Sequence, residues 1–120
     1  MERQDQSDKR RYPRAYTPIP VRYRKLGQSE EEARTMTVST NISEGGVCFS
    51  TNEFISRACR LIVELDMPEN SKSVKTISKI AWIKKSENDF EVGNQFLEMS
   101  KKDKLTVSSF VEKAISLASE

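Results

Sequence analysis

Two short stretches of this sequence carry charged and polar side chains at spacings that could bind a ligand. The first is Arg10-Arg11-Tyr12-Pro13-Arg14, which places arginines at positions i and i+4. The second is Asn41-Ile42-Ser43-Glu44-Gly45-Gly46, between two apolar runs. Arginine presents a planar fork of donors that matches a phosphate group. Each stretch alone also has an ordinary explanation, because spaced arginines occur by chance in basic tails and the second stretch is typical of a turn.

The spaced arginines belong to a basic block near the N-terminus. Seven basic residues and no acidic residue occur from Lys9 to Lys25, whereas the whole chain has a net charge of only +2. Such one-sided positive charge favours an anionic partner. The alternative is a solvated, disordered arm. The seven residues are Lys9, Arg10, Arg11, Arg14, Arg22, Arg24 and Lys25.

The amino-acid composition excludes several common kinds of enzyme active site. The chain has no histidine, which excludes Ser-His and Cys-His nucleophile pairs and all histidine metal sites. Its two cysteines, Cys48 and Cys59, cannot form a four-cysteine zinc site, and we interpret them as reduced, partly buried thiols. The motifs GxGxxG and GxxxxGK[ST] do not occur. We therefore expect a binding protein that is not an enzyme and that has no metal and no cofactor.

Length and hydropathy indicate a single domain. The chain has 120 residues, of which 36% are hydrophobic and 32% are charged, so part of it is expected to lie outside the core. No apolar run approaches the roughly 18–20 residues of a membrane span. Residues 1–8 are polar and predict a disordered tail. Because no apolar stretch follows Met1, we expect no signal peptide and a cytoplasmic location.

Most of the chain has the period-two pattern of β-strands. Apolar and polar residues alternate in six short runs, and the segments between them are rich in turn-forming residues. Regular short strands of this kind predict an antiparallel barrel or sandwich. The six runs begin near Ile19, Met36, Val47, Leu61, Ile77 and Phe90.

The last twenty residues have a helical pattern instead. Val107, Phe110 and Val111 begin an apolar stripe with steps of three and four, and Ser100 stands where a helix N-cap is expected. We expect an amphipathic helix over residues 101–120 that packs on the sheet. A helix from a partner protein is the alternative cover for this stripe.

Together and in this order, the two polar stretches resemble the motifs of the PilZ domain family. Its members carry RxxxR before the first strand and [D/N]xSxxG in the turn from the second strand to the third. Ile80-Ala81-Trp82-Ile83 is similar to the family's fifth strand, and Phe90-Glu91-Val92-Gly93-Asn94-Gln95-Phe96 is similar to its closing G-x-x-F strand. The resemblance covers residues 9–111.

The resemblance implies an all-β fold, a six-stranded antiparallel β-barrel with a C-terminal α-helix. The implied divisions are a disordered tail of residues 1–8, a barrel of residues 9–100 that includes the RxxxR arm, and an amphipathic helix of residues 101–120. It also implies that the chain binds the bacterial second messenger cyclic di-GMP, whose phosphates and guanines both suit arginine.

The motif positions give the expected ligand contacts. Arg10 and Arg14 match the two arginines of RxxxR, and Arg11 is an expected third. Asn41 and Ser43 are short polar side chains suited to a guanine edge, although the uncharged Asn41, where many family members have Asp, should bind more weakly. Glycine allows a ligand to approach the backbone closely. The remaining expected contacts are Gly46, and with less weight Lys9, Gly45 and Trp82.

Trp82 has two interpretations. Its indole is either a stacking surface for a guanine or a side chain buried in the barrel or under the helix, and we favour burial. Tyr12 and Tyr16 lie among the arginines and are weaker candidates for stacking.

We expect the chain to act as a cyclic di-GMP receptor or adaptor. The N-terminal arm has few apolar residues and should be mobile without ligand, so binding would order it and change a surface read by an unidentified downstream protein. Two other functions remain open. The chain could be a small basic β-barrel that binds RNA or single-stranded DNA. It could also be a degenerate PilZ interaction module that binds no ligand.

Overall fold

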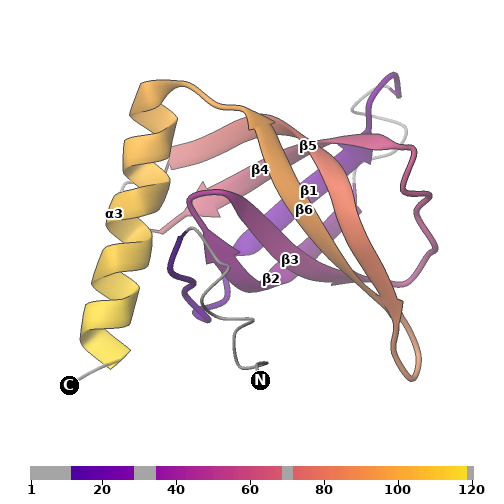
Figure 1. The fold of residues 1–120 in the computed structure, drawn as a ribbon, viewed down its shortest axis with the longest axis horizontal. Helices are drawn as coiled ribbons and strands as arrows, with labels where there is room; N and C mark the ends of the chain where they lie inside the picture. Colours follow the sequence, from indigo (N-terminus) through magenta and orange to yellow (C-terminus); the bar gives the residue numbers. More distant parts are fainter. Residues whose placement is uncertain (1–11, 29–34, 69–71, 119–120) are drawn as a thin grey trace, which may run out of the picture.

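The computed structural model describes residues 12–28, 35–68 and 72–118. Within these ranges, six antiparallel strands close into a barrel in the order β1-β2-β3-β6-β5-β4, and one helix follows them (Figure 1). This confirms the predicted barrel with a C-terminal helix. The elements are β1 (Pro20–Lys25), β2 (Thr35–Ser43), β3 (Gly46–Thr51), β4 (Arg60–Met67), β5 (Lys72–Lys85), β6 (Phe90–Glu98) and α3 (Lys101–Ala118).

Alternate side chains of the strands fill the barrel. In β4 every second residue is buried, and in β1 the inward residues Val21 and Tyr23 continue a buried row that begins at Ile19. Tyr23 stacks on Phe49 with ring centroids 5.0 Å apart, and its hydroxyl pairs with that of Thr51 at 2.6 Å. The interior is therefore a packed core, and a ligand has to bind on the outside.

The apolar residues at the start of β2 do not belong to this core. Met36 and Val38 are exposed, because they pair in register with Arg22 and Pro20, which point outward from β1. Cross-strand partners share a face, so the register with β1 decides which side of β2 is buried. Ser39 takes the inner position, where its hydroxyl accepts a hydrogen bond from the Ile19 amide at 3.0 Å.

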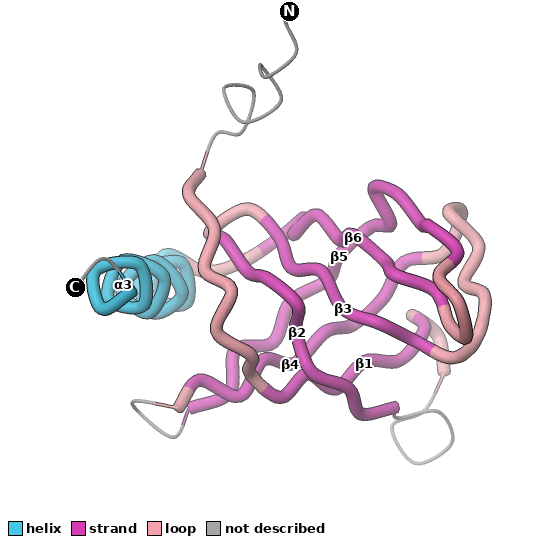
Figure 2. Tube along the Cα trace, turned by 90° about the horizontal axis from the view of Figure 1, so that it is seen from below, coloured by secondary structure: helices cyan, strands magenta, loops and turns pink. Residues whose placement is uncertain are grey.

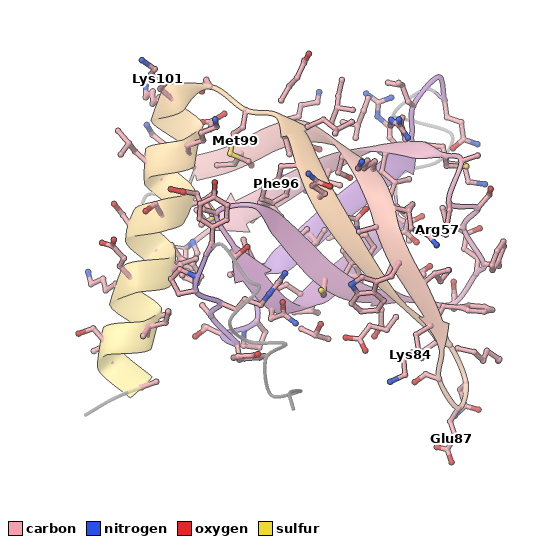
Figure 3. All side chains as sticks on the ribbon, viewed as in Figure 1. Arg57, Lys84, Glu87, Phe96, Met99 and Lys101 are labelled. Atoms are coloured by element: carbon pink, nitrogen blue, oxygen red, sulfur yellow. The ribbon has the colours of Figure 1, made fainter. Side chains whose placement is uncertain are left out.

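A β-bulge changes the direction of side chains in β5. Ile80 pairs with Asn94 and Trp82 pairs with Gly93, which leaves Ala81 as the extra residue. A bulge shifts the inward–outward alternation by one position. Ile80 is buried, Trp82 faces outward and Ile83 packs against the core. The Arg57 guanidinium, labelled in Figure 3, donates a hydrogen bond to the Ala81 carbonyl at 2.8 Å. The carbonyl of the extra residue in the bulge therefore has a hydrogen-bond partner.

Helix α3 covers one side of the barrel. Figures 1 and 2 show it standing beside the strands, and Val107, Phe110 and Val111 belong to the same core cluster as the strand residues. The stripe therefore packs on the chain's own barrel. The Asp103 amide donates to the Ser100 hydroxyl at 3.1 Å, as an N-cap requires. Neither Cys48 nor Cys59 forms a disulfide; the first is buried and the second half-buried.

Candidate functional site

The segment that leads into β1 is anchored to the barrel. The Ala15 amide donates to the Ile42 carbonyl at 2.8 Å, and the Ile42 amide donates back to the Ala15 carbonyl at 2.9 Å. Ala15 is only 2% exposed, and Figure 2 shows the segment running between the strands and α3. The few apolar residues of the N-terminal arm predict that almost nothing anchors it, and for residues 12–16, the described part of that arm, this prediction is wrong. The segment is held by the two backbone hydrogen bonds between Ala15 and Ile42 and by the buried side chain of Ala15. The small number of apolar residues in the segment gave no sign of either contact.

This anchored segment brings the two sequence motifs together. Arg14 and Asn41 lie on either side of the Ala15–Ile42 bridge, and the Arg14 guanidinium donates to the Asn41 side-chain carbonyl, Nη1 to Oδ1 at 2.5 Å. Both side chains are half-buried. Asn41 uses its acceptor on Arg14, so it fixes the direction of the guanidinium while the remaining N–H groups of Arg14 stay available.

The turn between β2 and β3 is built by its own polar groups. The Gly45 amide donates to the Ser43 hydroxyl at 3.1 Å, and the Phe96 amide donates to the Gly45 carbonyl at 3.0 Å. Ser43 is 3% exposed, so its hydroxyl supports the turn. The Tyr12 ring lies on Gly45, where an added Cβ would stand 2.9 Å from Tyr12 Cδ2. A glycine here lets the aromatic ring close against the turn.

Gly46 has a packing role that needs no ligand. A Cβ built on Gly46 would lie 2.1 Å from the backbone carbonyl oxygen of Asn94 in β6. Its φ is outside the left-handed region, so close contact between strands, and not torsion, requires glycine. The close backbone approach that the sequence indicates is thus an approach by the neighbouring strand.

A cavity of about 470 Å³ lies beside these residues. Its wall comes from the N-terminal segment, the β2–β3 turn, β3, β5, β6 and the first turn of α3. Figure 3 shows Phe96 and Met99, two lining residues, between β6 and α3. The predicted residues that line it are Arg14, Ser43, Gly45, Gly46 and Trp82. Asn41 does not line the cavity, but it holds the guanidinium of Arg14, which does.

Trp82 forms an exposed part of this wall. Its indole lies on Gly93, since a Cβ at Gly93 would stand 2.3 Å from Trp82 Cε2 and Nε1. Trp82 is 40% exposed, so the favoured interpretation of a buried aromatic is wrong. The reason is the bulge at Ala81, which turns the side chain from the inner face of β5 to the outer face.

Several residues of the cavity carried no signal in the sequence. Glu44, Glu98 and Lys104 line it, and they come from a turn, the end of a strand and a helix. Their sequence context indicates only exposed charged positions, and only the fold brings them together. Lys9, Arg10 and Arg11 lie outside the described residues.

Two further observations concern the described part of the chain only. It contains no group of three or more His, Cys, Asp or Glu side chains that could hold a metal ion. It also contains no helix with the length and apolar character that a membrane span needs.

Solved structures with the same fold come from several bacteria. The structure of Bacillus subtilis inhibitor of motility (MotI/DgrA) has a TM-score of 0.77 at 19% identity, over 93% of this chain and 53% of that one. The chain thus spans about half the length of that protein. The PilZ domain of YcgR from Escherichia coli, solved with c-di-GMP, has a TM-score of 0.71 at 16% identity, over 92% of this chain and 94% of that domain.

A third structure, the K. pneumonia MrkH-c-di-GMP complex, has a TM-score of 0.69 at 16% identity, over 93% of this chain and 54% of that one. No curated protein matches the chain in sequence. The PilZ domain family model, in contrast, matches residues 8–113, which include both polar motifs, all six strands and most of α3. The chain therefore belongs to the PilZ domain family.

Proposed function

We propose that this chain is a receptor for cyclic di-GMP. The observation that carries the proposal is the contact between Arg14 and Asn41, which joins the RxxxR and NxSxxG motifs at the edge of a cavity. Two solved relatives of the same fold, the YcgR PilZ domain and MrkH, are complexes with c-di-GMP. A volume of about 470 Å³ falls in the usual range of small-molecule sites, roughly 300–1,000 Å³.

The cavity offers complementary groups for each part of this ligand. The free N–H groups of Arg14 suit a phosphate or the O6 and N7 edge of guanine. The exposed indole of Trp82 suits stacking on a guanine, because the ring lies against Gly93 while the residue stays 40% exposed. Tyr12, held on Gly45, offers a second aromatic surface.

The other motif residues have supporting roles in the proposed site. Asn41 positions Arg14, and Ser43 and Gly45 shape the turn that carries the ligand-facing backbone. Gly46 keeps β3 close enough to β6 to form the wall. Lys9, Arg10 and Arg11 precede the described residues. We propose that their positive charges help to bind the phosphates of the same ligand.

We further propose that the chain is an adaptor and not an enzyme. Binding would change the surface formed by the N-terminal residues, and an unidentified downstream protein would read that surface.

Isothermal titration calorimetry with cyclic di-GMP tests the receptor proposal directly. A single-stranded oligonucleotide titrated in parallel separates the receptor from a nucleic-acid-binding barrel. Saturable heat with cyclic di-GMP and none with the oligonucleotide is the expected result. Heat with the oligonucleotide alone would assign the chain to the second class, and heat with neither would make it an interaction module without ligand.

Trp82 provides an independent readout of the same titration. It is the only tryptophan in the chain and it lines the cavity, so its fluorescence should change as the ligand binds. An unchanged spectrum at a ligand concentration that saturates the calorimetric signal would place the ligand away from this cavity.

A further inference from the structure

The cavity continues from the N-terminal motif to helix α3. Arg14 stands on one part of its wall and Lys104, in the first turn of α3, stands on another. Figure 1 shows that α3 begins beside the end of β6, which explains how a helical residue reaches a cavity built mainly by strands. The site of the proposed function therefore has a helical wall that neither sequence motif includes.

The charges on this wall balance among the described residues. Arg14 and Lys104 are the cations, and Glu44 and Glu98 are the carboxylates. A ligand with two phosphates gains from a cation near each of them, and Arg14 is one such cation on the described wall. Lys104 is the second cation that the described wall supplies.

Lys104 has the freedom to bind such a group. Among the described residues its ammonium forms no ion pair or hydrogen bond, and its side chain is exposed. Its backbone is fixed, because the Lys104 amide donates to the Ser100 carbonyl at 2.9 Å. A flexible four-carbon stem on a fixed helical turn can place an ammonium over a range of positions in the cavity.

We propose that Lys104 binds a phosphate of the same ligand, so that the ligand bridges the N-terminal segment and helix α3. This inference rests on the proposed function, because it assigns a second anion contact to the site of that function. Helix α3 is packed on the barrel through Val107, Phe110 and Val111, which lie beyond its first turn. A ligand that holds Lys104 therefore restrains the first turn of the helix, which precedes these core contacts.

The test compares two exposed lysines of the same helical turn. Lys104 lines the cavity and Lys101 does not, so Lys104→Gln and Lys101→Gln remove the same charge at different distances from the site. Glutamine and lysine have similar helix propensities, so both variants should fold and melt like the wild type. We expect Lys104→Gln to weaken cyclic di-GMP binding about fivefold to tenfold and Lys101→Gln to change it less than twofold.

Hydrogen exchange supplies a readout that a general charge effect would not produce. Ligand should slow amide exchange in the first turn of α3 in the wild type and in Lys101→Gln, and this slowing should be lost in Lys104→Gln. Equal affinities of the two variants, or first-turn protection that persists without Lys104, would overturn the inference.

The two proposals fail in different ways. If the wild type does not bind cyclic di-GMP, the proposed function is wrong. If the wild type binds and Arg14→Ala loses affinity while Lys104→Gln does not, the receptor stands and the bridge to α3 is wrong.

Discussion

At the scale of single residues, the site depends on one hydrogen bond between two distant parts of the chain. The guanidinium of Arg14 is held by the uncharged acceptor of Asn41 at 2.5 Å. A carboxylate at the position of Asn41 would hold the guanidinium by charge as well. The amide instead directs Arg14 while leaving its positive charge unneutralised, which suits the binding of an anion.

Replacement of Arg14 tests this arrangement. Arg14→Ala should weaken cyclic di-GMP binding by about 1.5–3 kcal/mol, roughly tenfold to 150-fold, because a charged hydrogen-bond donor to the ligand is lost. Calorimetry measures the effect, and the melting temperature shows whether the fold is intact. Arg60→Ala, which removes an exposed arginine of β4, is the control and should bind like the wild type.

The neighbouring glycines of the β2–β3 turn should respond differently to a methyl group. Gly46→Ala should lower the free energy of unfolding by about 1–3 kcal/mol, since the new Cβ meets a strand carbonyl that cannot move alone. Gly45→Ala meets only the ring of Tyr12, an exposed side chain that can rotate away, so its stability should change little. Urea denaturation compares the two variants. An equal loss of unfolding free energy in the two variants would show that the β6 backbone moves away from a new methyl group as easily as the Tyr12 side chain does.

At the scale of elements, small irregularities decide which side chains face the site. The bulge at Ala81 turns Trp82 outward, and the register of β1 with β2 turns Met36 outward. The bridge between Ala15 and Ile42 has a similar effect, because it pairs the N-terminal segment with the last residues of β2 and brings Arg14 against Asn41. Each device is local in the fold and involves residues that are far apart in the sequence.

Amide exchange tests the anchoring of the N-terminal segment. The amides of Ala15 and Ile42 donate hydrogen bonds to each other's carbonyls, so they should exchange slowly without any ligand. An exposed turn such as that at Glu87 (Figure 3) should exchange fast in the same experiment and serves as the internal reference. Fast exchange at Ala15 in the free protein would restore the mobile arm that the sequence alone predicts for this segment.

At the scale of the whole molecule, charge is distributed more evenly than the basic N-terminus indicates. The net charge is +2, and the cavity wall in the described residues includes Glu44 and Glu98 as well as two cations. An anionic ligand therefore approaches a mixed wall, and its affinity depends on which charges lie nearest. Salt should weaken both the attraction of the ligand to the two cations and its repulsion by the two carboxylates.

Removal of a wall carboxylate should strengthen binding. Glu98→Gln should increase cyclic di-GMP affinity about twofold to fivefold at low ionic strength, because a like charge near the phosphates is lost. The gain should shrink in high salt, and calorimetry at two salt concentrations measures both values. Glu112→Gln, on α3 and away from the cavity, is the matched control. Weaker binding by Glu98→Gln would show that this carboxylate accepts a hydrogen bond from the ligand.

The sequence by itself predicted six short strands and a C-terminal helix, while its periodicity left barrel and sandwich open; the barrel followed from the resemblance of the two polar motifs to one family. Period-two alternation and a capped helical stripe are local patterns, and local patterns survive in any context that buries one face. The motifs are short and ordered along the chain, so they are readable without coordinates. This is why the strands, the N-cap at Ser100 and the candidates Arg14 and Asn41 could all be named in advance.

The tertiary structure decided which of these residues share a site and which face they present. The sequence favours burial of Trp82 in the barrel or under the helix, and only the pairing of β5 with β6 reveals the bulge at Ala81 that turns its side chain outward. Lys104 and Glu98 join the cavity because β6 ends beside the start of α3. Register, bulges and the docking of a helix arise from contacts between distant residues, and no local pattern encodes them.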